Sequence, residues 1–191
     1  MPNIFIIAGC NVAGKTTASF TILPEMLDCK EFVNADEIAK GLSPFQPESV
    51  SFQAGRIMIE RINELINSGV DFAFETTLTT LSYINTILFA IGKGYTISLL
   101  YFWLNDLDLA IERVKTRVNE GGHNIPEETI RRRYSRGIIN LTTKFVNICD
   151  YWIVINNSGR PFTFVAEGQR DTELKVHDEL IWQLIKNKSN E

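Results

Sequence analysis

Cysteine is scarce in this sequence and does not occur in a metal-binding pattern. Cys10, Cys29 and Cys149 are the cysteines among 191 residues, an odd number without the paired spacing of a zinc site. Reduced thiols in a cytosolic protein fit this usage better than a disulfide framework. The N-terminal apolar run is also too short for a signal peptide, and no basic residues precede it. We therefore expect a cytoplasmic protein.

Long hydrophobic runs and a strong net charge are missing as well. No segment reaches the roughly 18 uninterrupted apolar residues that a membrane helix needs, so no membrane partner is expected. The formal net charge of -4 argues against nucleic acid as a partner. What is present is an ordinary globular composition, with 45% hydrophobic and 22% charged residues. The length suits one large domain, and we expect residues 1–191 to form it.

Apolar runs that favour strands alternate along the chain with amphipathic runs that favour helices. The strand-like runs lie at about 3–8, 31–34, 70–74, 96–103, 151–155 and 162–165, and the helical patterns at about 14–27, 47–67, 81–91, 107–119, 126–147 and 171–186. This alternation predicts a three-layer α/β fold, with a mainly parallel sheet and helices on both faces. The nearly continuous apolar run at 95–103 predicts a central strand buried on both faces.

The segment GCNVAGKTT is the most informative motif. Gly9 is followed by four residues and then by Gly14, Lys15 and Thr16, between a predicted strand and a predicted helix. Glycines allow backbone N–H groups to wrap a phosphate, and the helix start adds its positive end. Lys15 is then expected to reach the β- and γ-phosphates, and Thr16 to ligate Mg²⁺. The predicted nucleotide-binding residues are Gly9, Asn11, Val12, Ala13, Gly14, Lys15, Thr16 and Thr17.

Other nucleotide-related motifs are lacking, and this narrows the chemistry. A chance match in a glycine turn would not need the strand before the loop or the helix after it. The sequence has no NKxD guanine-reading motif, so ATP is favoured over GTP. It also has no LSGGQ segment and no apolar run ending in Asp-Glu, which makes ATP hydrolysis coupled to motion a weaker hypothesis. The turn at 155–159 follows the fifth predicted strand, and we expect its backbone to contact adenine.

Two carboxylates follow predicted strands at the edge of the sheet where ligands bind. Asp36 comes just after the second strand, and Glu75 and Thr77 end the third. Asp36 could take the proton of an attacking hydroxyl, hold Mg²⁺ through water, or cap a short helix. Glu75 could orient hydroxyls of the acceptor or contact Mg²⁺ through water, with Thr77 as a further hydrogen-bond donor, although a solvated loop carboxylate that caps the next helix is the alternative.

Arg56 lies on the apolar stripe of a predicted helix. This stripe consists of Phe52, Ile59, Ile62 and Ile66. A charge that faces a core needs an anionic partner, and a substrate could supply one. The alternative is a side chain whose stem covers apolar surface while its head reaches water. Arg56 is therefore an acceptor-binding candidate.

The chain between residues 113 and 136 carries seven Lys or Arg side chains around a glycine pair. Gly121 and Gly122 end one predicted helix, and Pro126 begins the next. Two helices joined in this way predict a helical lid that closes over a bound phosphate. His123 lies in the hinge, and we expect a turn histidine without a chemical role there.

The lid arginines differ in the direction that helical geometry gives them. Arg131 and Arg133 flank the apolar stripe of the second lid helix, whereas Arg132 and Arg136 point away from it. We therefore expect Arg131 and Arg133, with Arg117 from the first helix, to neutralise charge on a transferring phosphoryl group. A solvated basic face is the alternative.

Together these motifs resemble the zeta-toxin-like family of P-loop kinases, whose non-plasmid members are often labelled as predicted ABC-type ATPases. The resemblance covers about residues 4–156 and rests on GCNVAGKTT, VNADEIAKGLSP, AGRIMIERI, FETTL and RVNEGGHNIPEETIRRRY. It implies a fold like that of nucleoside-monophosphate kinases and ATP-dependent phosphorylation of a hydroxyl group. In the toxins of the family this hydroxyl is the 3′-hydroxyl of UDP-N-acetylglucosamine.

The resemblance also assigns roles to residues. It implies that Lys15 and Thr16 hold ATP and Mg²⁺, that Asp36 is the catalytic base, and that Glu75 and Thr77 contact the acceptor. An antitoxin protein is an implied partner. The chain departs from the family at GGH, which stands about where the toxins place a second phosphate-binding arginine, and at Val12, where many relatives carry glycine.

Three alternatives stay open at the level of sequence. The acceptor could be a small metabolite, or the end of a nucleic acid, although the acidic net charge argues against the second. The chain could also be a non-catalytic ATP-binding protein whose lid reports nucleotide occupancy to a partner. Substitution of Asp36 separates these classes, because only a catalytic base is needed for turnover and not for ATP binding.

Overall fold

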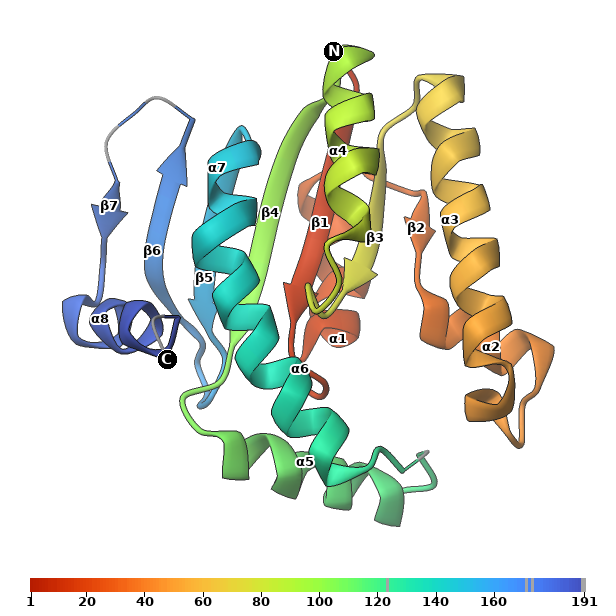
Figure 1. The fold of residues 1–191 in the computed structure, drawn as a ribbon, viewed down its shortest axis with the longest axis vertical. Helices are drawn as coiled ribbons and strands as arrows, with labels where there is room; N and C mark the ends of the chain where they lie inside the picture. Colours follow the sequence, from red (N-terminus) through yellow and green to blue (C-terminus); the bar gives the residue numbers. More distant parts are fainter. Residues whose placement is uncertain (123, 171, 173, 190–191) are drawn as a thin grey trace.

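One sheet forms the centre of the computed structural model, which describes residues 1–122, 124–170, 172 and 174–189. His123 lies outside the described residues. The strands are β1 (Asn3–Gly9), β2 (Phe32–Val33), β3 (Phe72–Thr76), β4 (Thr96–Trp103), β5 (Tyr151–Asn156), β6 (Thr163–Gln169) and β7 (Lys175–Val176). Their order is β2-β3-β1-β4-β5-β6-β7 (Figure 1). The first five are parallel, whereas β6 and β7 are antiparallel to their neighbours, so the predicted mainly parallel sheet is confirmed.

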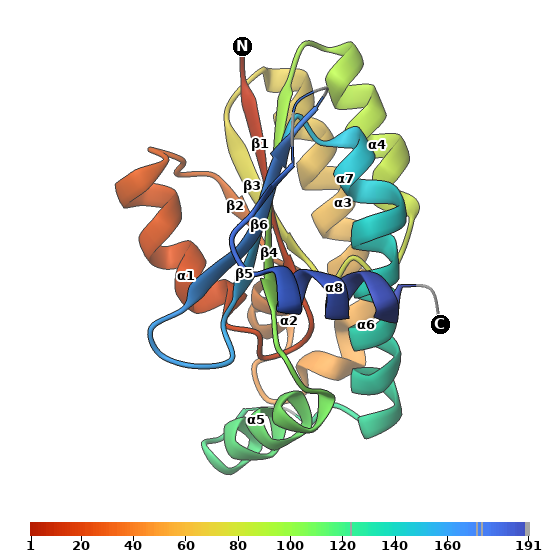
Figure 2. The same ribbon diagram turned by 90° about the vertical axis from the view of Figure 1, so that its left-hand side faces the viewer.

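Helices lie on both faces of this sheet. They are α1 (Lys15–Thr21), α2 (Ala35–Leu42), α3 (Ser51–Ser68), α4 (Ser82–Gly92), α5 (Leu107–Asn119), α6 (Glu127–Asn140), α7 (Val146–Ile148) and α8 (Glu179–Lys188), with short helical turns η1 (Ile22–Met26), η2 (Pro47–Val50) and η3 (Leu141–Phe145). Figure 2 shows α1 on one face and α3, α4, α6 and α7 on the other. The predicted three-layer α/β fold is therefore confirmed. Within the described ranges, no helix combines the length and the apolar character that crossing a bilayer requires.

Two predicted helices have different limits in the structure. The helix expected at 14–27 divides, because Pro24 has no N–H to continue the regular ladder and η1 follows α1 instead. The helix expected at 171–186 begins only at Glu179, where the side chain of Asp178 accepts the N–H of Ile181 at 3.0 Å. Part of the remainder, Lys175–Val176, pairs with β6 as the short strand β7.

The helix α3 turns a different face to the core from the one that the sequence predicts. Its buried residues are Ala54, Met58, Ile62, Leu65 and Ile66. Phe52 is 82% exposed and Ile59 is 41% exposed, so the predicted stripe is wrong in its first half. The buried positions of α3 recur every three or four residues from Ala54. Phe52 and Ile59 therefore lie beside the face of α3 that packs on the core. Arg56 lies on this exposed side.

The face of the sheet that carries α1 is only partly covered. Ser98 and Leu100 of β4 are half-buried, Ile153 of β5 is half-buried, and Phe164 of β6 is exposed. The apolar run of β4 predicts burial on both faces, and this is wrong for its first half. There α1 packs against β1, and Figure 1 shows it behind β1 and β3, away from β5 and β6. A cleft opens on this face beside the phosphate loop.

Candidate active site

The loop between β1 and α1 has the strained backbone of a phosphate-binding loop. Gly9 has φ 142°, and a Cβ there would lie 2.3 Å from the carbonyl oxygen of Phe102. Gly14 has φ 88°, and a Cβ there would lie 2.3 Å from the side-chain nitrogen of Asn157. Both positions therefore require glycine. Val12 has φ 57°, a left-handed conformation that is costly for a β-branched residue and characteristic of functional loops.

Lys15 lies inside this loop at the start of α1. Its side chain is buried, and its Nζ donates to the carbonyl oxygen of Cys10 at 2.8 Å. The same ammonium group is 3.4 Å from Oε1 of Glu75. A buried cation at the start of a helix, after a glycine-rich loop, is an anion-binding arrangement. The structure thus places Lys15 where the motif predicts it.

Glu75 of β3 contacts the phosphate loop in this structure. Its Oε2 accepts the hydroxyl of Thr16 at 2.8 Å and the side-chain N–H of Asn34 at 2.9 Å. The alternative of a solvated carboxylate that caps the next helix is wrong, because the side chain is only 10% exposed and the N-terminus of α4 has no side-chain cap. Thr77 lies apart from this cluster, and its hydroxyl pairs with that of Thr79 at 2.6 Å.

Asp36 lies in the first turn of α2 with its side chain exposed to the cleft. It does not cap the helix. The cap is Asn34, whose Oδ1 accepts the backbone N–H of Asp36 at 2.8 Å. The alternative in which Asp36 serves as a cap is therefore wrong, and its carboxylate is left free of that bond. Asp36 shares the wall of the cleft with Lys15 and Thr16.

The four candidate arginines lie in different places. Arg133 donates from Nη1 to Oδ1 of Asn11 at 3.1 Å, which puts its guanidinium on the phosphate loop. Burial lowers the pKa of Arg133, and the nearby carboxylate of Asp36 opposes that shift. Arg117 lines the cleft. Arg131 instead pairs on the surface with Glu127 at 2.6 Å. Arg56, exposed on α3, lines a separate small groove with Phe52 and Glu60.

Two residues of the site were not singled out from the sequence. Arg113 of α5 donates from Nη2 to the carbonyl oxygens of Asn157 and Ser158, each at 3.0 Å. The side chain of Asn157 donates in turn to the carbonyl oxygen of Ala13 at 2.8 Å. The turn after β5 is thus tied both to the phosphate loop and to α5. The sequence shows that a basic run begins at Arg113, but it does not indicate that Arg113 binds the turn after β5.

The cleft has a volume of about 1400 Å³ and two unlike halves. Its polar half holds Lys15, Thr16, Asp36, Glu75, Arg113 and Arg117. Its apolar half lies along the open sheet face and is lined by Phe5, Leu100, Ile153 and Phe164, with Phe20 of α1 also in the wall of the cleft. The charged groups of the site therefore meet at one end of a cleft whose other end suits a flat apolar group.

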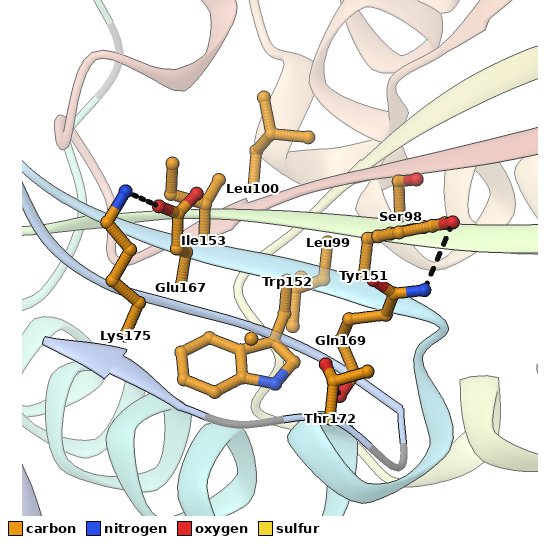
Figure 3. A pocket seen from close by; sticks show the side chains of 11 residues that line it. Ser98, Leu99, Leu100, Tyr151, Trp152, Ile153, Glu167, Gln169, Thr172 and Lys175 are labelled. Carbon is orange, nitrogen blue, oxygen red and sulfur yellow. Dashed lines mark hydrogen bonds and ion pairs between the residues drawn. The ribbon is translucent and has the colours of Figure 1, made fainter.

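A second, smaller hollow of about 430 Å³ adjoins this apolar half (Figure 3). It shares Ser98, Leu100 and Ile153 with the large cleft. Its polar groups already pair with one another, as Lys175 does with Glu167 at 3.1 Å. None of the predicted site residues lines this hollow.

Known proteins are similar to this chain in sequence and in fold. A family model described as zeta toxin matches residues 1–179. An uncharacterized protein of Haemophilus influenzae is 32% identical over 128 residues, which cover 66% of this chain and 88% of that protein.

Two solved structures share the fold at low sequence identity. One is a crystal structure of AvrRxo1-ORF1 with AvrRxo1-ORF2 and ATP, with a TM-score of 0.76 and 16% identity, covering 97% of this chain. The present chain spans only 63% of that chain. The other belongs to the PezAT chromosomal toxin-antitoxin system of Streptococcus pneumoniae, with a TM-score of 0.61 and 16% identity, covering 100% of this chain and 87% of that chain.

Proposed function

This chain belongs to the zeta toxin family of P-loop kinases, and from this we propose that it transfers the γ-phosphoryl group of ATP to a hydroxyl group of a small molecule. The observation that carries the proposal is the cluster in which Glu75 joins Lys15 and Thr16, beside Asp36 and Arg133. A loop that only bound ATP would not need a free carboxylate in its cleft or a partly buried arginine bonded to its Asn11.

The nucleotide would bind in the polar half of the cleft. Lys15 and the N–H groups of the loop face the β- and γ-phosphates. The hydroxyl of Thr16, with the carboxylate of Glu75 next to it, supplies oxygen ligands of the kind that Mg²⁺ prefers. When bound, Mg²⁺ would neutralise phosphate charge. Adenine would extend toward the turn after β5, in keeping with the backbone contact expected there.

Asp36 is the proposed base. In the transfer, the bond between the γ-phosphorus and the ADP oxygen breaks as the acceptor oxygen bonds to phosphorus. The acceptor proton passes to the carboxylate of Asp36. Arg133 and Arg117 neutralise charge on the moving group. Arg131 can join them only if it leaves Glu127.

The acceptor side lies beyond Asp36. Glu75 and Thr77, with Arg56, are retained as proposed acceptor contacts, although Glu75 already serves the phosphate loop and Arg56 lies outside the cleft. The proposed acceptor is a nucleotide sugar such as UDP-N-acetylglucosamine, on the model of the family's toxins. A small metabolite is the alternative acceptor.

The proposal extends to the organisation and the setting of the protein. We infer a single domain over residues 1–191, in which residues 113–136 form the lid that excludes water during transfer. Similarity to a toxin-antitoxin system supports an antitoxin partner. A reaction that consumes ATP also fits the expected cytoplasmic location.

The decisive experiment is incubation with γ-labelled ATP and a panel of nucleotide sugars and small metabolites, in which the labelled product is followed. We expect label transfer that depends on one acceptor. The variant Asp36→Asn should lower turnover by about 10²–10⁴-fold while ATP binding is retained.

Two other outcomes would contradict the proposal. Release of label as free phosphate at the same rate with and without every acceptor would indicate a hydrolase. Tight ATP binding without any turnover, unchanged by Asp36→Asn, would indicate a regulatory ATP-binding protein.

A further inference from the structure

Asn34 is a buried polar side chain that connects the two carboxylates of the site. Its Nδ2 donates to Oε2 of Glu75 at 2.9 Å, and its Oδ1 accepts the backbone N–H of Asp36 at 2.8 Å. The residue itself is 5% exposed. Because a buried amide without partners would be costly, both of these bonds matter for its placement.

The contacts of Asn34 join three separate elements. It lies between β2 and α2, Glu75 lies in β3, and Glu75 in turn contacts Thr16 and Lys15 of α1. Through its Oδ1, Asn34 also holds the backbone N–H of Asp36 in the first turn of α2. A single amide therefore connects the nucleotide half of the site with the residue proposed as base.

We propose that Asn34 is a positioning residue for phosphoryl transfer. It holds the carboxylate of Glu75 against Thr16 and Lys15, and it fixes the start of α2 so that Asp36 faces the cleft. This inference rests on the proposed function, because it takes the roles of Glu75 and Asp36 from it. An amide is suited to the task because it donates and accepts at once, which neither a carboxylate nor an apolar group can do.

A purely structural role makes a different prediction. Asn, Asp and Ser are about equally good N-caps, so a residue that only caps α2 would tolerate both replacements. A positioning residue would not. Asn34→Ser keeps an oxygen for the cap but does not reach Glu75, and Asn34→Asp sets a second carboxylate against Glu75. We expect nucleotide binding and thermal stability to be highest with the native Asn34, lower in Asn34→Ser and lowest in Asn34→Asp.

The test measures binding of the fluorescent analogue mant-ATP with Mg²⁺, together with thermal unfolding. Asn34→Asp should weaken mant-ATP binding about tenfold or more and lower the melting temperature, and Asn34→Ser should fall between it and the native protein. In Asn34→Asp/Glu75→Gln the new amide can donate to the new carboxylate. This double variant should therefore recover the melting temperature of Glu75→Gln alone. The control Asn63→Asp, at an exposed position of α3, should change neither quantity.

Two results would overturn the inference. One is an Asn34→Asp variant that melts and binds mant-ATP as the native protein does. The other is a double variant that is no better than Asn34→Asp. Neither measurement needs an acceptor, so both remain decisive if no compound in the panel is phosphorylated. That failure would count against the proposed function and not against the placement of Glu75 by Asn34.

Discussion

Arg131 and Arg133 are two positions apart on the same helix and have unlike surroundings. Arg133 is partly buried against Asn11 of the phosphate loop, whereas Arg131 makes an exposed pair with Glu127, four residues before it. Exposed pairs of this kind contribute little to stability. A desolvated guanidinium beside the loop has a larger effect on an anion, because water screens it less. The geometry therefore favours Arg133 as the arginine that acts on the phosphoryl group.

This difference leads to a prediction for a matched pair of variants. Arg133→Ala should reduce phosphoryl transfer by about a hundredfold or more, because it removes a charge that stabilises the transition state. Arg131→Ala should leave turnover within about twofold of the native rate, since it removes only a surface pair. Single-turnover transfer of label from γ-labelled ATP measures both. Equal losses in the two variants would mean that Arg131 leaves Glu127 when the lid closes.

Among the elements, α6 approaches the turn after β3 unusually closely. A Cβ at Gly137 would lie 2.8 Å from the carbonyl oxygen of Thr77 and 3.1 Å from the hydroxyl of Tyr101. Next to it, Asn140 donates to the carbonyl oxygen of Leu78 at 2.6 Å. The C-terminal half of α6 is thus fixed to the body of the fold. The movement proposed for residues 113–136 would then occur nearer to the other end of this segment, toward Gly121 and Gly122.

This contact predicts opposite effects at two helical glycines. Gly137→Ala should destabilise the protein by about 1–3 kcal/mol, because the methyl group meets backbone atoms that cannot easily move. Gly55→Ala in α3 should stabilise it by about 0.5–1 kcal/mol, since no atom lies within 4 Å of the added methyl group. Urea unfolding followed by circular dichroism would give both values. A stabilising Gly137→Ala would show that α6 shifts away from Thr77 at little cost.

The sequence predicts elements and motifs well where the relevant residues are close along the chain. The loop from Gly9 to Thr16 is local, and its spacing alone predicts its structure. The bond between Asn34 and Glu75 joins residues 41 positions apart, and that between Asn157 and Ala13 joins residues 144 apart. Such contacts depend on strand order and on the length of each turn, which hydrophobic periodicity does not determine. The sequence therefore shows the residues of the candidate site, but it does not predict these contacts between them.

On the scale of the whole molecule, the helix α8 supports α6. Trp182 of α8 stacks on Trp152 of β5 with ring centroids 5.6 Å apart. Near the end of α8, the Nζ of Lys188 donates to the hydroxyl of Tyr134 in α6 at 3.2 Å. The helix α8 thus connects the antiparallel side of the sheet with α6.

The buried thiols predict how the stability of the whole protein depends on alkaline pH. Burial raises the pKa of Cys10 from 9.0 to about 11, and that of Cys149 to about 12. Between about pH 9 and 11 the unfolded chain loses these protons while the folded protein keeps them. The free energy of unfolding should therefore fall as pH rises through this range.

Urea unfolding at pH 8 and pH 10.5 would measure the fall. Cys149→Ala removes one of the buried thiols and should make the dependence on pH less steep. Equal slopes for this variant and the native protein would show that Cys149 ionises as readily in the fold as in the unfolded chain.

Both edges of the sheet are formed by very short strands. Among the described residues, β2 and β7 have two residues each, and β7 begins with the charged side chain of Lys175. A neighbouring molecule that tried to add a strand would find few unpaired backbone groups and, at one edge, a charge to desolvate. The long hydrophobic strands β1 and β4 are enclosed between other strands. Aggregation by strand addition should therefore require β2 or β7 to detach first. Resistance to fibril growth then depends on the two short pairings, β2 with β3 and β7 with β6.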